Sequence, residues 1–173
     1  DTNVTMEDAE ADFISVENIE EFDHNLFLKG TNDTTIAEAF VLRHGSHVIY
    51  DTASKQWRVF SNGPWKDAED AARMVVAHYN RVIIDLRQTI PMMNDFVQTE
   101  LLIKWLNKSM NQGTINSVFK IVQSRLALGI TKLDSNPDLI GMKDMVHEIP
   151  TGTARSAEGK DYVFRSVGTH FDP

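Results

Sequence analysis

The chain contains no cysteine, which excludes disulfide bonds, thiolate metal ligands and cysteine nucleophiles and suits a reducing compartment. No apolar run approaches the roughly 20 residues that span a bilayer. No basic segment followed by an apolar one opens the chain, so we predict neither a secretory signal nor a membrane partner. The initiator methionine is also missing, since the chain starts at Asp1. We therefore expect it to be a piece of a larger protein, with a trimmed mature end as the alternative.

Bases are absent from residues 1–28, which hold nine of the 25 acids. The other 145 residues hold 16 acids and 17 bases, so the formal net charge of -8 belongs to the N-terminal segment. We interpret residues 1–25 as an acidic linker or tail, with a docking segment for a basic partner as the alternative. A near-neutral body does not exclude nucleic-acid binding.

The short motifs of nucleotide and hydrolase chemistry are missing as well. Six residues separate Gly152 from Gly159 where a phosphate loop needs four, and Asp161 follows Lys160 where such a loop has Ser or Thr. No nucleophile elbow or His-Glu-x-x-His run occurs. His44 and His47 lack a carboxylate or thiol partner in sequence, and we interpret them as surface or packing residues. We predict no catalytic residue and no metal site.

A second stretch of one-sided charge lies between Glu100 and Asp134, where the sequence has no acid. Clustered bases attract phosphate, and aromatic neighbours can stack on bases. A solvated helix surface and an interface with an acidic partner are the alternatives. The predicted nucleic-acid-binding residues are the bases of this stretch: Lys104, Lys108, Lys120, Arg125 and Lys132.

Apolar spacing predicts a helical bundle. A short helix capped by Thr34 or Thr35 should run to Arg43, before Gly45. A long helix capped by Asp67 should end at Pro91, with an apolar stripe of Ala68, Ala71, Ala72, Val75, Tyr79, Val82, Ile83, Leu86 and Ile90. A helix capped by Asn94 should bury Val97, Leu101, Leu102 and Trp105. After a break at Gly113, a helix opened by Thr114 should bury Ile115, Val118, Phe119, Val122 and Leu126.

Short β-type runs flank these helices. Residues 47–50 and 56–60, joined by the loop 51–55, predict a hairpin, and Asn62-Gly63 a further turn, giving a three-stranded meander that ends at Trp65. Residues 145–149, a turn at 150–152 and residues 162–164 predict a C-terminal hairpin. We expect Trp57, Trp65 and Trp105 in the core. The predicted fold is α+β, predominantly α: an antiparallel helical bundle with a small β-meander and a C-terminal β-hairpin.

Three ordered motifs carry a resemblance to a known family. They are residues 56–66 (QWRVFSNGPWK), residues 133–141 (LDSNPDLIG), and residues 160–164 (KDYVF) followed by Gly168 and residues 171–173 (FDP). This order resembles the accessory domain that precedes the superfamily 3 helicase motor in phage, plasmid and poxvirus primase-helicases. The match covers residues 26–173. It departs where the family has an Asn-Gly turn, because residues 143–149 contain none.

The resemblance implies a role and partners. Such domains join the priming half to the motor and help form a collar on a hexameric ring, with neither primase nor ATPase residues of their own. We therefore expect self-association of the parent protein, contact with single-stranded DNA, ATP and Mg only in a following motor domain, and the cytoplasm of a bacterial host. A stand-alone single-stranded DNA-binding module, a phage regulatory adaptor and a small enzyme of unknown type are the alternatives.

Overall fold

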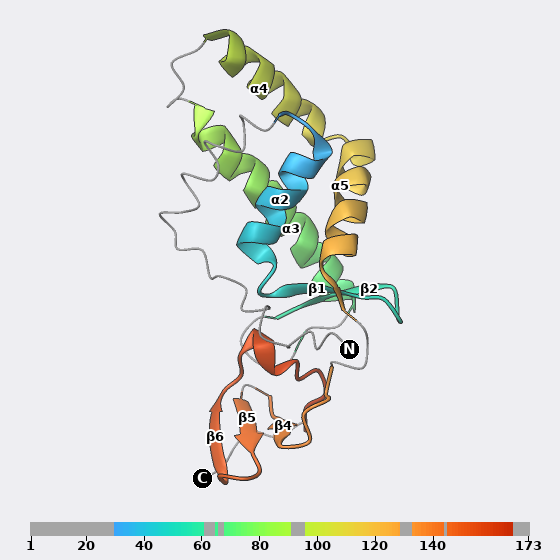
Figure 1. Ribbon diagram of the computed structural model, residues 1–173, viewed down its shortest axis with the longest axis vertical. Coiled ribbons are helices and arrows are strands. Elements are labelled where there is room, and N and C mark those ends of the chain that lie inside the picture. The colour runs from blue at the N-terminus through green and yellow to red at the C-terminus, as the bar shows by residue number, and fades with distance from the viewer. Residues whose placement is uncertain are drawn as a thin grey trace, which may run out of the picture.

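The computed structural model describes residues 30–60, 65, 68–90, 96–128, 133–143 and 145–167. A helical body occupies one end of the molecule, a small sheet crosses its base, and a second sheet lies beyond the first (Figure 1). This is the predicted mainly helical α+β fold. No helix of the described ranges is both long and apolar enough to cross a membrane. The predicted acidic segment 1–25 lies outside these ranges.

Helix α3 (Ala68–Gln88) is the centre of the body and packs against α2, α4 and strand β2. Its predicted stripe is confirmed, because six positions at helical spacing are at most 1% exposed: Ala71, Val75, Tyr79, Val82, Ile83 and Leu86. Ala72 is the exception and faces solvent. The predicted cap Asp67 and the predicted stop Pro91 lie outside the described residues.

Helices α2 (Asp33–His44) and α5 (Gln112–Arg125) pack against each other, and α2 also packs against α3. The cap of α2 is Asn32, not Thr34 or Thr35, because the Asn32 side chain accepts a hydrogen bond from the Thr35 amide at 3.1 Å. Gly45 caps the other end, as predicted. Gly113 does not break the chain between helices. It lies in the first turn of α5, one residue after the helix begins.

Helix α4 (Phe96–Ser109) is rotated away from its predicted orientation. It buries Leu102 and Leu106, whereas Val97 and Leu101, predicted to be buried, are 67% and 59% exposed. The Tyr79 hydroxyl donates a hydrogen bond to the Ser109 carbonyl oxygen at 2.6 Å, inside the core. Burial, with a smaller contribution from Asp33, raises the pKa of Tyr79 to about 12. This bond attaches the last residue of α4 to the middle of α3.

The first sheet has the order β2-β1-β3. Strands β1 (Val48–Asp51) and β2 (Gln56–Val59) form the predicted hairpin, and the Asp51 carboxylate accepts hydrogen bonds from the backbone and hydroxyl of Ser54 in its turn. The predicted turn at Asn62-Gly63 lies outside the described residues, and Trp65 after it is not in a strand. Strand β3 (Ala127–Leu128) follows α5 and pairs with β1 in parallel. Trp57 and Trp65 are buried as predicted, and Trp105 is half-buried.

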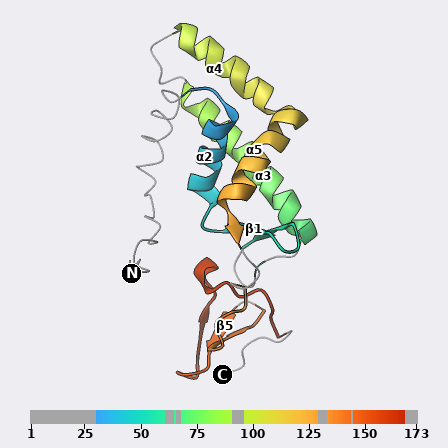
Figure 2. The same ribbon diagram turned by 45° about the vertical axis from the view of Figure 1, so that its right-hand side comes forward.

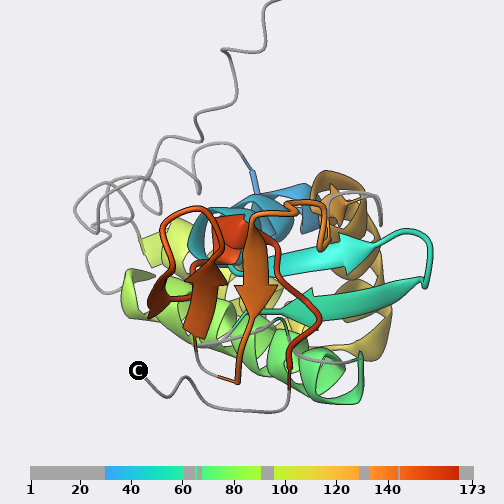
Figure 3. The same cartoon turned by 90° about the horizontal axis from the view of Figure 1, so that it is seen from below.

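The second sheet is antiparallel, with the order β4-β5-β6, and lies on the side of the first sheet away from the helices (Figures 2 and 3). Its strands are β4 (Leu139–Gly141), β5 (Met145–Glu148) and β6 (Thr153–Ser156). The predicted run at 145–149 and the turn after it are confirmed. The predicted strand at 162–164 is wrong. That segment is irregular and follows the short 3₁₀ helix η3 (Gly159–Asp161).

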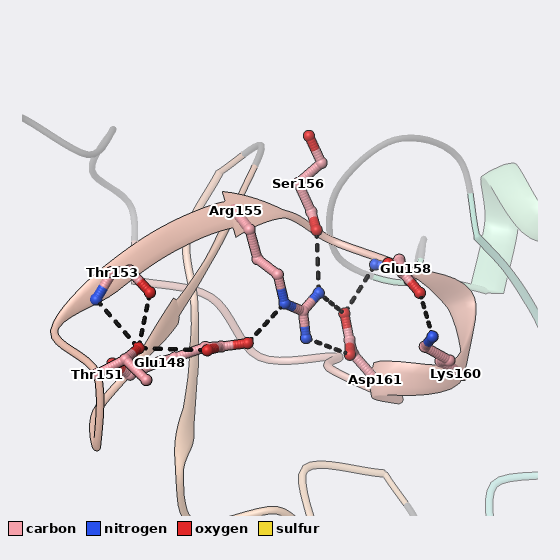
Figure 4. Close-up of polar contacts among 8 residues, drawn as sticks. All are labelled: Glu148, Thr151, Thr153, Arg155, Ser156, Glu158, Lys160 and Asp161. Carbon is pink, nitrogen blue, oxygen red and sulfur yellow. Dashed lines mark hydrogen bonds and ion pairs between the residues drawn. The ribbon is translucent and has the colours of Figure 1, made fainter.

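Arg155 ties this sheet to η3 (Figure 4). Its guanidinium donates to Glu148 at 2.7 Å and to both carboxylate oxygens of Asp161 at 2.8 Å. Burial acts to raise the pKa of Asp161, but the hydrogen bonds from Arg155 and the Glu158 amide outweigh it and hold that pKa below its usual value. The guanidinium of Arg155, bound to carboxylates of both β5 and η3, therefore fixes the path of the backbone after β6.

The three motifs of the sequence meet between the two sheets, in what we call the motif junction (residues 58, 65, 134, 141 and 162–167). From the first motif, the Trp65 amide donates to the Val163 carbonyl oxygen at 3.1 Å. The Trp65 ring stacks on Tyr162 at 6.2 Å and 6°. The Arg58 guanidinium lies 4.3 Å from the centre of the Phe164 ring, a cation–π distance. The helical body is thereby joined to the third motif.

The second motif closes the junction from the other side. The Asp134 carboxylate accepts hydrogen bonds from the amides of Phe164 at 2.7 Å and Arg165 at 3.0 Å. The Val167 amide donates to the Gly141 carbonyl oxygen at 2.9 Å. A β-carbon at Gly141 would overlap the Arg165 carbonyl oxygen and come within 2.5 Å of Val163. Glycine is therefore required there for close approach of two backbones.

We predict that Gly141→Ala destabilises the domain by about 1–3 kcal/mol, the range for overpacking of a tight site. Gly113→Ala is the matched control, since nothing lies within 4 Å of a β-carbon at that helical position. It should be neutral or stabilise by roughly 0.5–1 kcal/mol. Urea unfolding of both variants measures the difference; equal stabilities would contradict the close contact at Gly141.

Candidate functional site

The exposed side of α4 gathers part of the predicted nucleic-acid-binding set. Val97, Leu101, Lys104 and Lys108 recur at i, i+4, i+7 and i+11, so they share one helix face, which we call the outer face of α4. All four are exposed. Neither lysine forms a salt bridge with a residue that the structure describes. The face thus combines apolar area with two positive charges.

The other three predicted nucleic-acid-binding residues, Lys120, Arg125 and Lys132, differ in their surroundings. Lys120 is exposed on α5. Arg125 forms a salt bridge with Glu38 of α2 at 3.2 Å, so its charge is already matched within the domain. Lys132 lies outside the described residues. Of the five predicted residues, the structure brings together Lys104 and Lys108 on one face.

A groove of about 690 Å³ lies beside Lys108, between the start of α2 and the end of α4. Its lining includes the acids Asp33 and Glu38 as well as Lys108 and Trp105. The two carboxylates oppose a phosphate backbone, so the groove itself does not extend a DNA-binding surface.

The segment at 152–161 has no phosphate-loop geometry. It forms β6 and η3, and Arg155 there is engaged by Glu148 and Asp161. Glu69 and Asp70 lie in the first turn of α3, where the helix dipole favours acids, and both pair with Arg73. Their positions have structural explanations that require no catalytic role.

Three imidazoles meet at the base of the body. His44 is the last residue of α2, His47 follows in the turn before β1, and His78 comes from the middle of α3. One ring nitrogen from each lies within 4.8 Å of the other two. The rings of His44 and His78 stack at 4.2 Å, and His47 meets both edge-on at 5.2 Å. We call this group the histidine cluster.

The cluster is held in its neutral form. Burial lowers the pKa of each imidazole below its usual value, and repulsion from His78, His47 and Arg43 adds to this at His44, whose pKa falls to about 3. His44 Nδ1 and His47 Nε2 are 3.1 Å apart, which is a hydrogen-bond distance. Which of the two nitrogens donates depends on the tautomers of the rings. The sequence indicated only His44 and His47, because His78 is distant in the chain and joins them only when α2 packs on α3.

Comparison with known proteins bears on the parent of this domain. A search of curated proteins found no match. A protein-family profile described as "D5 N terminal like" matches residues 37–173. The match includes all four helices from within α2 onward, both sheets and the three motifs of the motif junction. The chain therefore belongs to the D5 N terminal like family, the N-terminal domain of D5-type primase-helicases.

Proposed function

We propose that this domain is a non-catalytic assembly and linker module of its parent primase-helicase, and that the outer face of α4 contacts a neighbouring subunit. The observation that carries the proposal is the exposure of Val97 and Leu101 beside two lysines on one helix face. Phe96, the first residue of the same helix, is 82% exposed and extends the apolar area.

Exposure of these side chains has an energetic cost that a partner would remove. Burying a Val, Leu or Phe side chain contributes roughly 1.5–3 kcal/mol relative to leaving it in water. Contiguous apolar area rimmed by polar groups is typical of interaction sites.

The motif junction supports the linker half of the proposal. Backbone hydrogen bonds, a ring stack and a cation–π contact fix the C-terminal sheet to the helical body. A rigid connection of this kind transmits the orientation of the body to the chain that follows. In this proposal ATP and Mg belong to the motor of the parent, and this domain positions that motor.

A second role follows from the charge of the same region. Lys104, Lys108 and Lys120 are exposed, and residues 101–133 contain no acid that would repel phosphate. We infer that these lysines guide single-stranded DNA toward the motor by non-specific phosphate contacts. A stand-alone DNA-binding module would share this chemistry, but would bind without subunit contacts.

We expect the double variant Val97→Glu/Leu101→Glu of the parent protein to dissociate into smaller species, because charge replaces apolar contact. Val76→Glu/Ile84→Glu is the matched control, since these α3 side chains are 43% and 46% exposed. The control should keep the oligomer. Native mass spectrometry measures the state, and circular dichroism checks folding. An intact oligomer in the α4 variant would refute the proposed contact.

Neutralising Lys104, Lys108 and Lys120 to Gln should weaken binding of single-stranded DNA by the parent. Each lost phosphate contact lowers the slope of log K against log salt by about 0.7, so the triple variant should lose about 2. Fluorescence anisotropy over a salt series measures this. The same change at Lys55, Lys143 and Lys160, exposed bases elsewhere, should leave the slope unaltered. Equal slopes in all three proteins would remove the DNA role and leave assembly.

A further inference from the structure

We propose that His44, His47 and His78 form a binding site for a zinc-class divalent transition-metal ion that bridges α2, the β1 turn and α3. This inference is independent of the proposed assembly function. It rests on three imidazoles from two separate parts of the chain, with one nitrogen from each within 4.8 Å of the others.

The geometry is close to that of a zinc site. Three nitrogens bound tetrahedrally at roughly 2.05 Å lie about 3.3 Å from one another. His44 Nδ1 and His47 Nε2 are already 3.1 Å apart. The larger separations involve His78, whose ring stacks on His44 with an angle of 26° between planes. Coordination would require the half-buried His78 ring to tilt out of this stack, so that its nitrogen approaches the other two.

The hydrogen-bonding of the cluster is incomplete without an ion. Nε2 of His44 and Nε2 of His78 are buried and have no hydrogen-bond partner among the described residues. Buried imidazole nitrogens normally have partners, so the orphan Nε2 of His78 indicates a missing ligand. Nε2 of His44 is not part of this argument, because His44 would coordinate through Nδ1. The Ser46 hydroxyl lies 3.3 Å from His47 Nδ1, which would hold the proton on Nδ1 and leave Nε2 for the metal.

The donor set selects the class of ion. Neutral imidazoles suit zinc, cobalt, nickel and copper, whereas magnesium and calcium prefer oxygen ligands. Burial keeps the three rings unprotonated, the state in which they can coordinate. Three protein ligands leave a fourth position for water or for a group from a partner. The adjacent charge of Arg43 is offset by Asp85 at 3.9 Å.

Such an ion would hold the end of α2 against α3. The turn containing Ser46 also faces η3, since a β-carbon at Gly159 would come within 2.8 Å of the Ser46 carbonyl oxygen. The site therefore lies where the helical body, the first sheet and η3 meet. We infer a stabilising, cross-linking role for the ion.

Titration of the full 173-residue chain with Co²⁺ tests the site, because tetrahedral cobalt has a distinctive visible spectrum. We expect one equivalent per chain, displacement by Zn²⁺, and a rise in thermal midpoint with either ion. His78→Gln should weaken binding by more than the 10–100-fold that loss of an outer-shell partner costs. His147→Gln, on β5, should bind like the wild type.

His47→Gln provides a second ligand variant at a turn, should His78→Gln fail to fold. Absence of the tetrahedral spectrum in the wild type would overturn the proposal and leave the cluster as a packed stack of neutral rings. Wild-type affinity in both ligand variants would also overturn it, since the ion would then bind elsewhere. One bound ion, lost with either ligand, establishes the site.

Discussion

The hydrogen bond from the Tyr79 hydroxyl to the Ser109 carbonyl oxygen determines how α4 sits on the body. Tyr79 is fully buried, so its hydroxyl must find a partner there. The tyrosine ring also meets Phe119 of α5 edge-on at 5.5 Å, which places one side chain between three helices. With Ser109 fixed, α4 turns Leu102 and Leu106 inward, and Val97, Leu101 and the lysines outward. The surface that we propose for assembly follows from this contact together with the burial of Leu102 and Leu106.

The elements that could be predicted from the sequence are those with their own periodic signal. The stripe of α3 is buried as its spacing indicates, and the β1–β2 hairpin forms at its turn. Strand β3 could not be predicted, because two residues carry no alternation and the strand depends on where α5 ends. The rotation of α4 was missed for a similar reason. Its sequence offers two apolar faces, and the choice between them is made by Tyr79, on a different helix.

The candidate sites, like the secondary structure, could be predicted only where their residues are close together in the sequence. The sequence correctly gathers Lys104 and Lys108 on one face, since their spacing is local, but it does not reveal that Arg125 pairs with Glu38 of another helix. The histidine cluster needs α2 to pack on α3 before His78 approaches His44. The three family motifs are far apart in the chain and have no common local structure, yet all three contribute to one junction between the sheets. Their contacts attach the C-terminal sheet to the helical body.

The central claim is that the outer face of α4 is covered by a neighbouring subunit in the parent protein. Hydroxyl-radical footprinting of that protein, assembled and diluted to dissociation, measures this directly. The account predicts that Val97 and Leu101 are protected from oxidation only in the assembled state, while Ile84, exposed on α3, reacts equally in both. Equal oxidation of Val97 and Leu101 in the two states would contradict it.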